Sequence, residues 1–463
     1  MKRTRYFFAG LCVLVLGAGL IACGSSSTSS NSNPNPPPAA TAPVAIYGQD
    51  APLASVITFQ LTLMSLTASD GVNTTTLLST PQMVDFARLT GLRTLLDLNT
   101  APPGSYTSVT LNIASPVIGY INTAGNTPTI TMLNGTLTTS SITVLMNPPL
   151  VLTNSDLNGL RLDFDMRQSL QVDLNGQITG TVVPTFDIRQ VNPANAEAEI
   201  DDLRGGVVSV NTANQSFVMQ IPNGRQITVQ IGPDTTTDSG DDLTTFTTNT
   251  IVAVSGELNR TTMVLDADEV SVLSQDHFIA DGLITNVQTP TASDTNIGMF
   301  VREALPANPA FPPDTIDPFD LPSNAKYLIY RLNLPITQLL FNSSNLITGQ
   351  NITLGGPLSN TSFTVKRVVL HRQGVYGPWV VGSTVIQNGN TGTFKITEQG
   401  IVGVLLNNTA LTVLTSDATE FDGLSGLSAL SGNQAIPLDV VGLLLQDPST
   451  GGPVLVANRV ATP

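Results

Sequence analysis

Alternation between apolar and polar residues is the feature that most limits how this chain can fold. Every second residue is apolar in 57–63, and the same pattern returns in 109–113 and 160–166. Successive side chains of a strand point to opposite faces, so each segment is predicted to form a strand with one buried and one solvated face. Gly and Pro turns separate these segments, and long amphipathic helical patterns are hard to find. The sequence therefore predicts an all-β protein that begins with a β-sandwich.

The first 22 residues have the pattern of an export signal. Basic residues at positions 2, 3 and 5 precede an uncharged apolar run that ends at Ala22, and this order is typical of secretory signals. The run closes on Leu20-Ile21-Ala22-Cys23, which resembles the lipobox of bacterial lipoproteins. The resemblance implies cleavage before Cys23, a diacylglycerol on this cysteine and, often, a further acyl chain on its amino group.

Residues 23–43 are predicted to be a flexible tether. Ser, Asn, Thr and Pro dominate this tract, which has too little apolar surface to offset the entropy of ordering it. One acyl chain holds a protein at a membrane only weakly, whereas several hold it durably. Gly24 follows the cysteine at the position where an Asp would suggest retention at the inner membrane. We therefore expect lipid anchoring in the cell envelope, at the outer membrane if the cell is Gram-negative.

Net charge and cysteine usage narrow the partners of the remainder. The chain carries a formal net charge of −15, and all the charged residues of the predicted signal are basic. A field of this sign repels phosphate backbones, so nucleic acid is not expected as a partner. Cys12 leaves with the signal and Cys23 is predicted to be acylated, so the mature body is expected to contain neither a free thiol nor a disulfide.

Four short segments in residues 44–190 together resemble a known family. They are Gln49-Asp50-Ala51-Pro52, Val84-Asp85-Phe86 with Leu89, Pro103-Gly104-Ser105-Tyr106, and Leu162-Asp163-Phe164-Asp165 with Ser169-Leu170. Their order and spacing resemble the bacterial domain of unknown function 4382. The resemblance implies a sandwich of transthyretin or immunoglobulin-like character and no known reaction. We assign residues 44–195 to this domain.

The rest of the chain carries a threefold internal repeat. Similar strand-like segments open the repeats at 204–210, 280–287 and 382–386. Each repeat later reaches a strand glycine, namely Gly256, Gly355 or Gly442. A glycine inside a strand often marks a bulge or a close approach of two backbones. The pattern predicts three small barrels of five or six strands.

We assign these barrels to residues 203–275, 276–380 and 381–463. The first and third resemble the domain of unknown function 5666, a short β-domain of exported bacterial proteins. The second departs from that pattern through a Pro- and Asp-rich insertion at 305–323. Small barrels of this kind include modules that bind oligosaccharides or oligonucleotides, and the acidic charge argues against the oligonucleotides.

Two groups of carboxylates are candidates for cation binding. Asp163 and Asp165 stand two residues apart, so they lie on the same face of their predicted strand. Asp234, Asp238 and Asp241 belong to an acidic loop with a turn glycine. Calcium takes about six to eight oxygen ligands, and the loop lacks the ligand order of an EF-hand. A polar outward strand face and a solvated hairpin loop are the simpler interpretations, so no metal or cofactor is expected.

Histidine and cysteine usage argues against an enzyme. The two histidines, His277 and His371, fall in the second predicted barrel, and neither lies near a Gly-x-Ser-x-Gly elbow. With the cysteines assigned to signal and anchor, the chain also lacks the usual ligand set for zinc. The single tryptophan, Trp379, stands in a Gly/Pro linker, where it either contacts a carbohydrate or plugs a hinge between units.

These observations favour an envelope lipoprotein with a non-catalytic binding, adhesion or scaffolding role. Its expected partners are the membrane, through the lipid, and a glycan or an envelope protein. One alternative is a hydrolase of polysaccharide or peptide that uses surface carboxylates, since glycosidases need two carboxyl groups that face one another. The other is a purely structural spacer, for which tandem β-units suffice.

Overall fold

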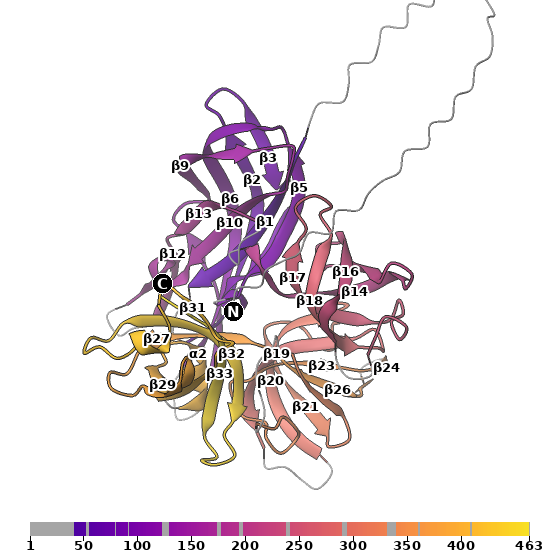
Figure 1. Ribbon diagram of the computed structural model, residues 1–463, viewed down its shortest axis with the longest axis vertical. Helices are drawn as coiled ribbons and strands as arrows, with labels where there is room; N and C mark the ends of the chain where they lie inside the picture. Colours follow the sequence, from indigo (N-terminus) through magenta and orange to yellow (C-terminus); the bar gives the residue numbers. More distant parts are fainter. Residues whose placement is uncertain are drawn as a thin grey trace, which may run out of the picture. The chain divides into compact units, whose positions relative to one another are not determined.

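The computed structural model describes residues 41–51, 55–78, 80–90, 92–122, 129–173, 177–193, 198–237, 241–288, 294–330, 339–359, 362–407 and 410–462. The predicted signal peptide, Cys23, the tether up to residue 40 and Asp238 lie outside these residues. Almost all of the described regular structure is β-strand (Figure 1), which confirms the predicted all-β class. The helical segments are short, namely η1 (Phe86–Leu89), α1 (Met166–Ser169), α2 (Ile401–Leu406) and η3 (Leu427–Ala429). Within the described ranges, no helix is long and apolar enough to cross a membrane.

Two main sheets enclose the core of the N-terminal sandwich. The first has the strand order β13-β10-β1-β5, and its β1 and β10 run parallel. Its strands are β1 (Ala42–Ala51), β5 (Thr94–Ala101), β10 (Asn158–Asp165) and β13 (Phe186–Val191). The second has the order β3-β2-β6-β7, with β4 paired to β2 and β9 paired to β6. Its strands are β2 (Val56–Ser69), β3 (Thr74–Leu78), β4 (Gln82–Asp85), β6 (Gly104–Asn122), β7 (Thr129–Asn134) and β9 (Ser141–Leu152).

The apolar residues of the predicted strands meet between these sheets. Phe59 of β2 and Phe164 of β10 stack with ring centroids 4.8 Å apart, and Phe86 and Phe186 pack around them. A small third sheet, β11-β12-β8, adds further apolar contacts at one side. Its strands are β8 (Thr136–Leu137), β11 (Leu170–Val172) and β12 (Ile178–Val182).

The first repeat forms a closed five-stranded barrel. Its strands follow the spatial order first-second-third-fifth-fourth, and the third and fifth run parallel. They are β14 (Ile200–Asn211), β15 (Ser216–Gln220), β16 (Gln226–Thr237), β17 (Ile251–Leu258) and β18 (Leu265–Ser274). The apolar side chains of these strands fill the barrel and join Ala45 and Tyr47 of the sandwich.

The second repeat has the same strand order, but its third strand is split in two. One part, β21, pairs with β20, and the other, β22, runs parallel to the last strand β26. Residues 315–322 of the predicted insertion form strand β21. The sheet consists of β19 (Ile279–Val287), β20 (Asp294–Leu305), β21 (Thr315–Pro322), β22 (Lys326–Ile329), β23 (Asn351–Gly355) and β26 (Arg367–Leu370), and the hairpin β24 (Leu358–Ser359) and β25 (Ser362–Phe363) lies between the last two.

In the third repeat, β30 and β33 run parallel, like the third and fifth strands of the first barrel. A single bridge between Trp379, which follows β27, and Ile396 of β29 links the first strand of this repeat to the second. Strand β27 pairs with β32 and therefore belongs to this repeat, although it lies before the expected boundary at 380/381. The expected opening at 382–386 runs instead into the hairpin strand β28. The strands are β27 (Gln373–Pro378), β28 (Val385–Asn388), β29 (Thr391–Thr397), β30 (Ala410–Thr415), β31 (Glu420–Asp422), β32 (Pro437–Gln446) and β33 (Pro453–Ala461).

Two of the three repeat glycines stand at β-bulges, as predicted. The strand register shifts beside Gly256 in β17 and beside Gly442 in β32. A Cβ on either glycine would collide with the backbone of the following strand. Gly355 instead ends β23, where a Cβ would meet the carbonyl oxygen of Leu273 in the first barrel. These glycines allow strands and units to approach closely.

The face of β2 that alternation predicts to be solvated is buried where the sandwich meets the second repeat. Thr58 is fully buried, and Gln60 donates to both carboxyl oxygens of Asp314 at 2.8 and 2.9 Å. Ile57, which alternation places on the face toward the sandwich core, packs instead against Leu283 and Phe300 of that repeat, at a register shift between Val56 and Thr58. Polar residues on this face of β2 therefore contact another part of the protein. An alternating pattern alone cannot distinguish a face in contact with solvent from a face in a polar interface.

Candidate functional site

A polar cavity of about 440 Å³ lies between the outer face of the first sandwich sheet and the third repeat. One wall is formed by β1, β10 and β13, and the other by β31, β32 and β33. Six carboxylates line it, namely Asp50, Asp163, Asp165, Asp187, Asp422 and Asp439. Five guanidinium groups lie among them, namely Arg93, Arg161, Arg167, Arg189 and Arg459.

Strand register arranges part of this wall in two rungs of opposite charge. Asp187, Asp163 and Gln49 are directly paired across β13, β10 and β1. Two residues earlier along β10, Arg161 is paired with Arg189 of β13. Residues paired across strands share a face of the sheet. An acidic rung and a basic rung therefore lie next to one another on the wall of the cavity.

Burial shifts the protonation of the carboxyl groups on these walls. Burial raises the pKa of Asp163 to about 7, and the nearby carboxylates of Asp187 and Asp165 add to the effect. Burial also raises the pKa of Asp439, on the opposite wall, to about 6. The pKa of Asp50 is raised well above its usual value, first by burial and then by Asp163 and Asp165. Asp163 and Asp439 therefore change charge near neutral pH.

Asp50 is the most buried of the six carboxyl groups. It is 3% exposed, and neither of its oxygens accepts a hydrogen bond in normal geometry. The backbone N–H of Met166 approaches it and lowers its pKa, but by less than burial raises it. Arg161 is also buried, its Nε is without an acceptor, and its nearest carboxylate, Asp163, is 3.6 Å from its guanidinium nitrogen. The side chains of Asp50 and Arg161 are thus less completely paired than is usual for buried polar groups.

The predicted pair Asp163 and Asp165 divides between two roles. Asp163 lies on the cavity wall with its side chain 22% exposed. Asp165 ends β10 and accepts hydrogen bonds from the backbone and side chain of Gln168, which caps α1. Among the described residues no group of three or more His, Cys, Asp or Glu side chains is arranged to hold a metal ion.

The residues of the predicted acidic loop are also separated in the structure. Asp234 is exposed on β16, and Asp238 lies outside the described residues. Asp241 is 4% exposed and binds both terminal nitrogens of Arg367, at 2.8 and 2.9 Å, and Nζ of Lys326 at 2.7 Å. The carboxylate of Asp241 thus joins the first barrel to the second repeat.

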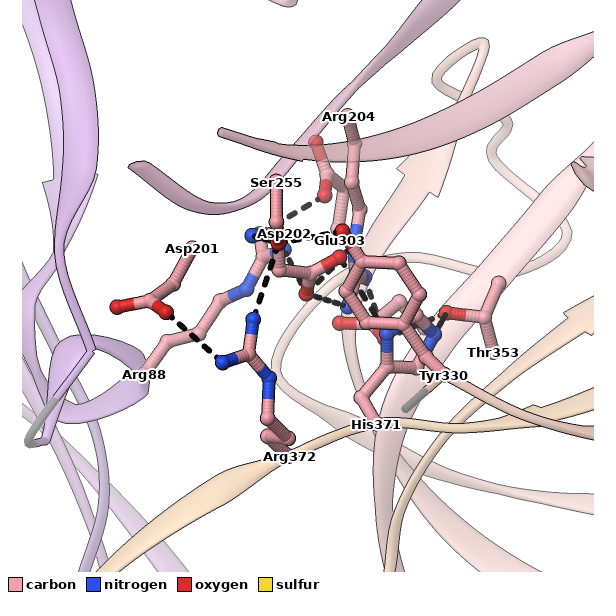
Figure 2. A network of polar contacts seen from close by, with 11 residues as sticks. Arg88, Asp201, Asp202, Arg204, Ser255, Glu303, Tyr330, Thr353, His371 and Arg372 are labelled. Atoms are coloured by element: carbon pink, nitrogen blue, oxygen red, sulfur yellow. Dashed lines mark hydrogen bonds and ion pairs between the residues drawn. The ribbon is translucent and has the colours of Figure 1, made fainter. Parts of the chain in front are cut away.

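A second cluster of charges, which the sequence did not reveal, is buried except for the partly exposed side chains of Arg88 and Glu303 (Figure 2). Arg204 of β14 binds Asp202 at 2.6 Å and Asp281 of β19 at 2.5 Å. Arg372 binds Asp201 at 3.1 Å and Ser255 at 3.0 Å. The sandwich contributes Arg88, which lies 3.6 Å from Asp202 and 3.0 Å from Glu303 of β20. The sandwich, the first barrel and the second repeat all meet in this network.

A bulge in β14 turns the aspartates of the network inward. The register between β14 and β17 shifts between Ile200 and Leu203, and Asp202 adopts a positive φ of 56°. Bulges commonly redirect a side chain in this way. Burial alone would raise the pKa of Asp202, but Arg204 and His371 hold it well below its usual value. Arg204 likewise keeps the pKa of the buried Asp281 low. Both aspartates are therefore ionised and paired.

His371 links this network to a hydroxyl group. Its Nδ1 lies 3.3 Å from Asp202, and its Nε2 lies 2.9 Å from Oγ1 of Thr353, which also donates to Asp281 at 2.9 Å. This order of carboxylate, imidazole and hydroxyl resembles a catalytic triad. However, His371 and Thr353 are 0% exposed, so a substrate cannot reach the hydroxyl. The arrangement supports the packing of units rather than nucleophilic catalysis.

The tryptophan singled out in the sequence lies in the core. Trp379 is 2% exposed, packs in the third repeat and donates from Nε1 to Thr384 at 3.1 Å. Tyr330 is fully buried and shares a hydrogen bond of 2.5 Å with Ser255, whereas Tyr327 is half-buried. Trp379 therefore does not provide an exposed face for a carbohydrate.

Comparison with protein families agrees with the motifs in the sandwich. Residues 41–180 match the family model described as Domain of unknown function (DUF4382). Three of the four motif segments converge at one end of the sandwich, where the carboxylates of Asp163, Asp165 and Asp85 help to raise the pKa of Asp50. No curated protein matches this chain.

Proposed function

We propose that this protein is a lipid-anchored binding protein of the cell envelope, and that it binds a neutral saccharide in the cavity between the sandwich and the third repeat. The observation that carries the proposal is the wall on which an acidic rung, Asp163 with Asp187, adjoins a basic rung, Arg161 with Arg189. The anchor is supported by the lipobox-like residues 20–23.

The chemistry of the cavity favours a neutral ligand with many hydroxyl groups. A hydroxyl both donates and accepts, so it can bind a carboxylate and a guanidinium group at the same time. A ligand with a strong charge of either sign would meet like charges on one of the rungs, which is unfavourable. The volume of about 440 Å³ falls in the range of small-molecule sites. Small five-stranded barrels that bind oligosaccharides provide a fold-level analogy.

Calorimetry with the full chain tests the binding site. Saturable binding of neutral oligosaccharides is expected, and Asp163→Ala with Asp187→Ala should weaken it at least tenfold, or by about 1.4 kcal/mol. Asp234→Ala removes an exposed aspartate that does not line the cavity and should leave the affinity unchanged. The proposal fails if the folded protein binds no neutral saccharide, or if the double variant binds as well as the parent.

Labelling with palmitate tests the anchor. The parent chain should incorporate the label and fractionate with membranes, whereas Cys23→Ala should do neither. Retention of both properties by the variant would exclude Cys23 as the lipid attachment site.

A hydrolase is the second candidate, because the pKa of Asp163 is raised by burial to about 7. A general acid must hold its proton near the working pH, and Asp187 stands directly across the strand pair from Asp163. Glycosidases use two such carboxyl groups. Release of new reducing ends from bound saccharide, abolished by Asp163→Asn, would favour this reaction, and binding without release would favour the non-catalytic role.

A further inference from the structure

A second cavity, of about 620 Å³, lies between the sandwich and the first barrel. The sandwich contributes η1 and parts of β4 and β5, and the barrel contributes β14 and the turn at 221–225. Glu303 of the second repeat also reaches it. This cavity is separate from the one proposed for saccharide, since the two share no lining residue.

Apolar side chains form much of its wall. They are Leu78, Leu89, Leu92, Leu96, Leu203 and Ile221. Each is nine-tenths or more buried, so the surrounding protein holds it in place. Met83, which also lines the cavity, is 65% exposed. Apolar walls with a few placed polar groups are characteristic of small-molecule sites.

A fixed pair of opposite charges also lines this cavity. Arg88 and Glu303 lie 3.0 Å apart, and each side chain is 21% exposed. Arg88 also forms an ion pair with Asp202, which is itself bound to Arg204 within the buried network (Figure 2). The network therefore fixes the position of Arg88 before any ligand binds, which reduces the entropy lost on binding.

The remaining polar groups set the charge that a ligand can carry. Asp85 accepts backbone hydrogen bonds from Phe59 and Ala87 through Oδ1, and its buried Oδ2 has no donor. Arg225 is paired with Asp97. Across the whole lining, acidic groups outnumber arginines. An anionic amphiphile such as a fatty acid is therefore disfavoured.

We propose that this cavity binds an apolar α-amino acid. Its carboxylate would pair with Arg88, its ammonium group with Glu303, and its side chain would pack against the leucines and Ile221. A zwitterion matches this partly buried pair of opposite charges without adding net charge, and an aliphatic side chain matches the wall. Charge-assisted hydrogen bonds of this kind are stronger than neutral ones.

Calorimetry with the full chain and three related probes tests this assignment. Leucine should bind, whereas leucinamide, which lacks the carboxylate, and N-acetylleucine, which lacks the ammonium group, should each bind at least tenfold more weakly. Equal binding of all three probes would overturn the proposal, as would the absence of leucine binding at about 10 mM.

Variants locate the binding in this cavity. Arg88→Gln and Glu303→Gln should each weaken leucine binding at least tenfold, and Arg260→Gln, which changes an exposed arginine paired with Asp156, should not. Because Arg88 also contacts Asp202, Ile221→Trp provides a variant without loss of charge, which should weaken binding by filling the cavity. Unchanged affinity in the folded Ile221→Trp and Glu303→Gln proteins would contradict the location.

Discussion

The two charged regions of this protein use the same residue types in opposite ways. In the buried network, Asp202 and Asp281 are paired with Arg204, and their pKa values are held low. At the cavity between the sandwich and the third repeat, Arg161 lies 3.6 Å from Asp163, and burial together with neighbouring carboxylates raises the pKa of Asp163 to about 7. A buried charge with close partners holds units together, whereas an incompletely paired charge costs stability and remains available for a ligand.

Removing the cation from the paired region should have the largest effect. Arg204→Met leaves Asp202 and Asp281 buried without their guanidinium partner, so unfolding in urea should show a loss of about 3–5 kcal/mol. If the variant does not fold, the triple change Arg204→Met with Asp202→Leu and Asp281→Leu should recover a folded protein, because it removes Arg204 together with both carboxylates that it pairs with. A loss below about 1 kcal/mol for Arg204→Met would contradict the assigned role.

Substitution of Asp241 tests whether an ion pair between two units contributes to stability as the buried network does. Asp241→Asn weakens the contacts with Arg367 and Lys326 and should destabilise the protein by about 2 kcal/mol. Asp242→Asn is the matched control, since Asp242 is exposed and bonds only within its own turn. Similar losses in both variants, or stabilisation of the parent by added calcium, would argue for a cation at this loop instead.

Substitution of Asp163 should stabilise the protein, whereas substitution of the paired charges should destabilise it. Its folded pKa of about 7 lies above the usual 3.8, so the folded state holds more protons than the unfolded state between these values, and stability falls as the pH rises through them. Asp163→Asn cannot ionise, so it should be more stable than the parent by about 1–2 kcal/mol at pH 8 and nearly equal at pH 4. Thermal unfolding at the two pH values measures this, and equal shifts at both would refute it.

The smallest effect is expected at the exposed end of the acidic rung. The side chain of Asp187 is 65% exposed, so Asp187→Asn should change the free energy of unfolding by less than about 0.5 kcal/mol. Its effect on saccharide affinity is expected to be larger than its effect on stability. A large loss of stability would show that Asp187 belongs with the structural charges.

Strand alternation predicted the fold class because it depends on local geometry. The core positions Leu160, Leu162 and Phe164 are fully buried as their spacing requires. The opposite face of the same strand was expected to be solvated, but Arg161 is 5% exposed, because the third repeat covers it. Which surface packs on which depends on contacts between distant segments, and a single sequence does not display them.

The same limit applies to the sites. Asp163 was recognised from its spacing to Asp165, but its neighbours Asp187 and Asp439 come from other strands. The buried network left only a weak signal, namely charged residues inside otherwise apolar strands, such as Asp281 beside Gly282 and His371 after Leu370. The expected opening at Gly382 overlooks strand β27, although Arg372-Gln373-Gly374-Val375 matches Arg204-Gly205-Gly206-Val207 at three of four positions.

The contacts between units join residues that are far apart in the chain. Gln60 with Asp314 and Arg88 with Glu303 are separated by 254 and 215 positions. Contacts at such separations close large loops, which is entropically costly, whereas most strand pairs within each unit join segments that are nearer in sequence. A species with folded but undocked units would keep its strands and lose both cavities, since their walls come from different units. Ligand binding would therefore report on docking of the units, and circular dichroism on their folding, so the two processes can be followed separately.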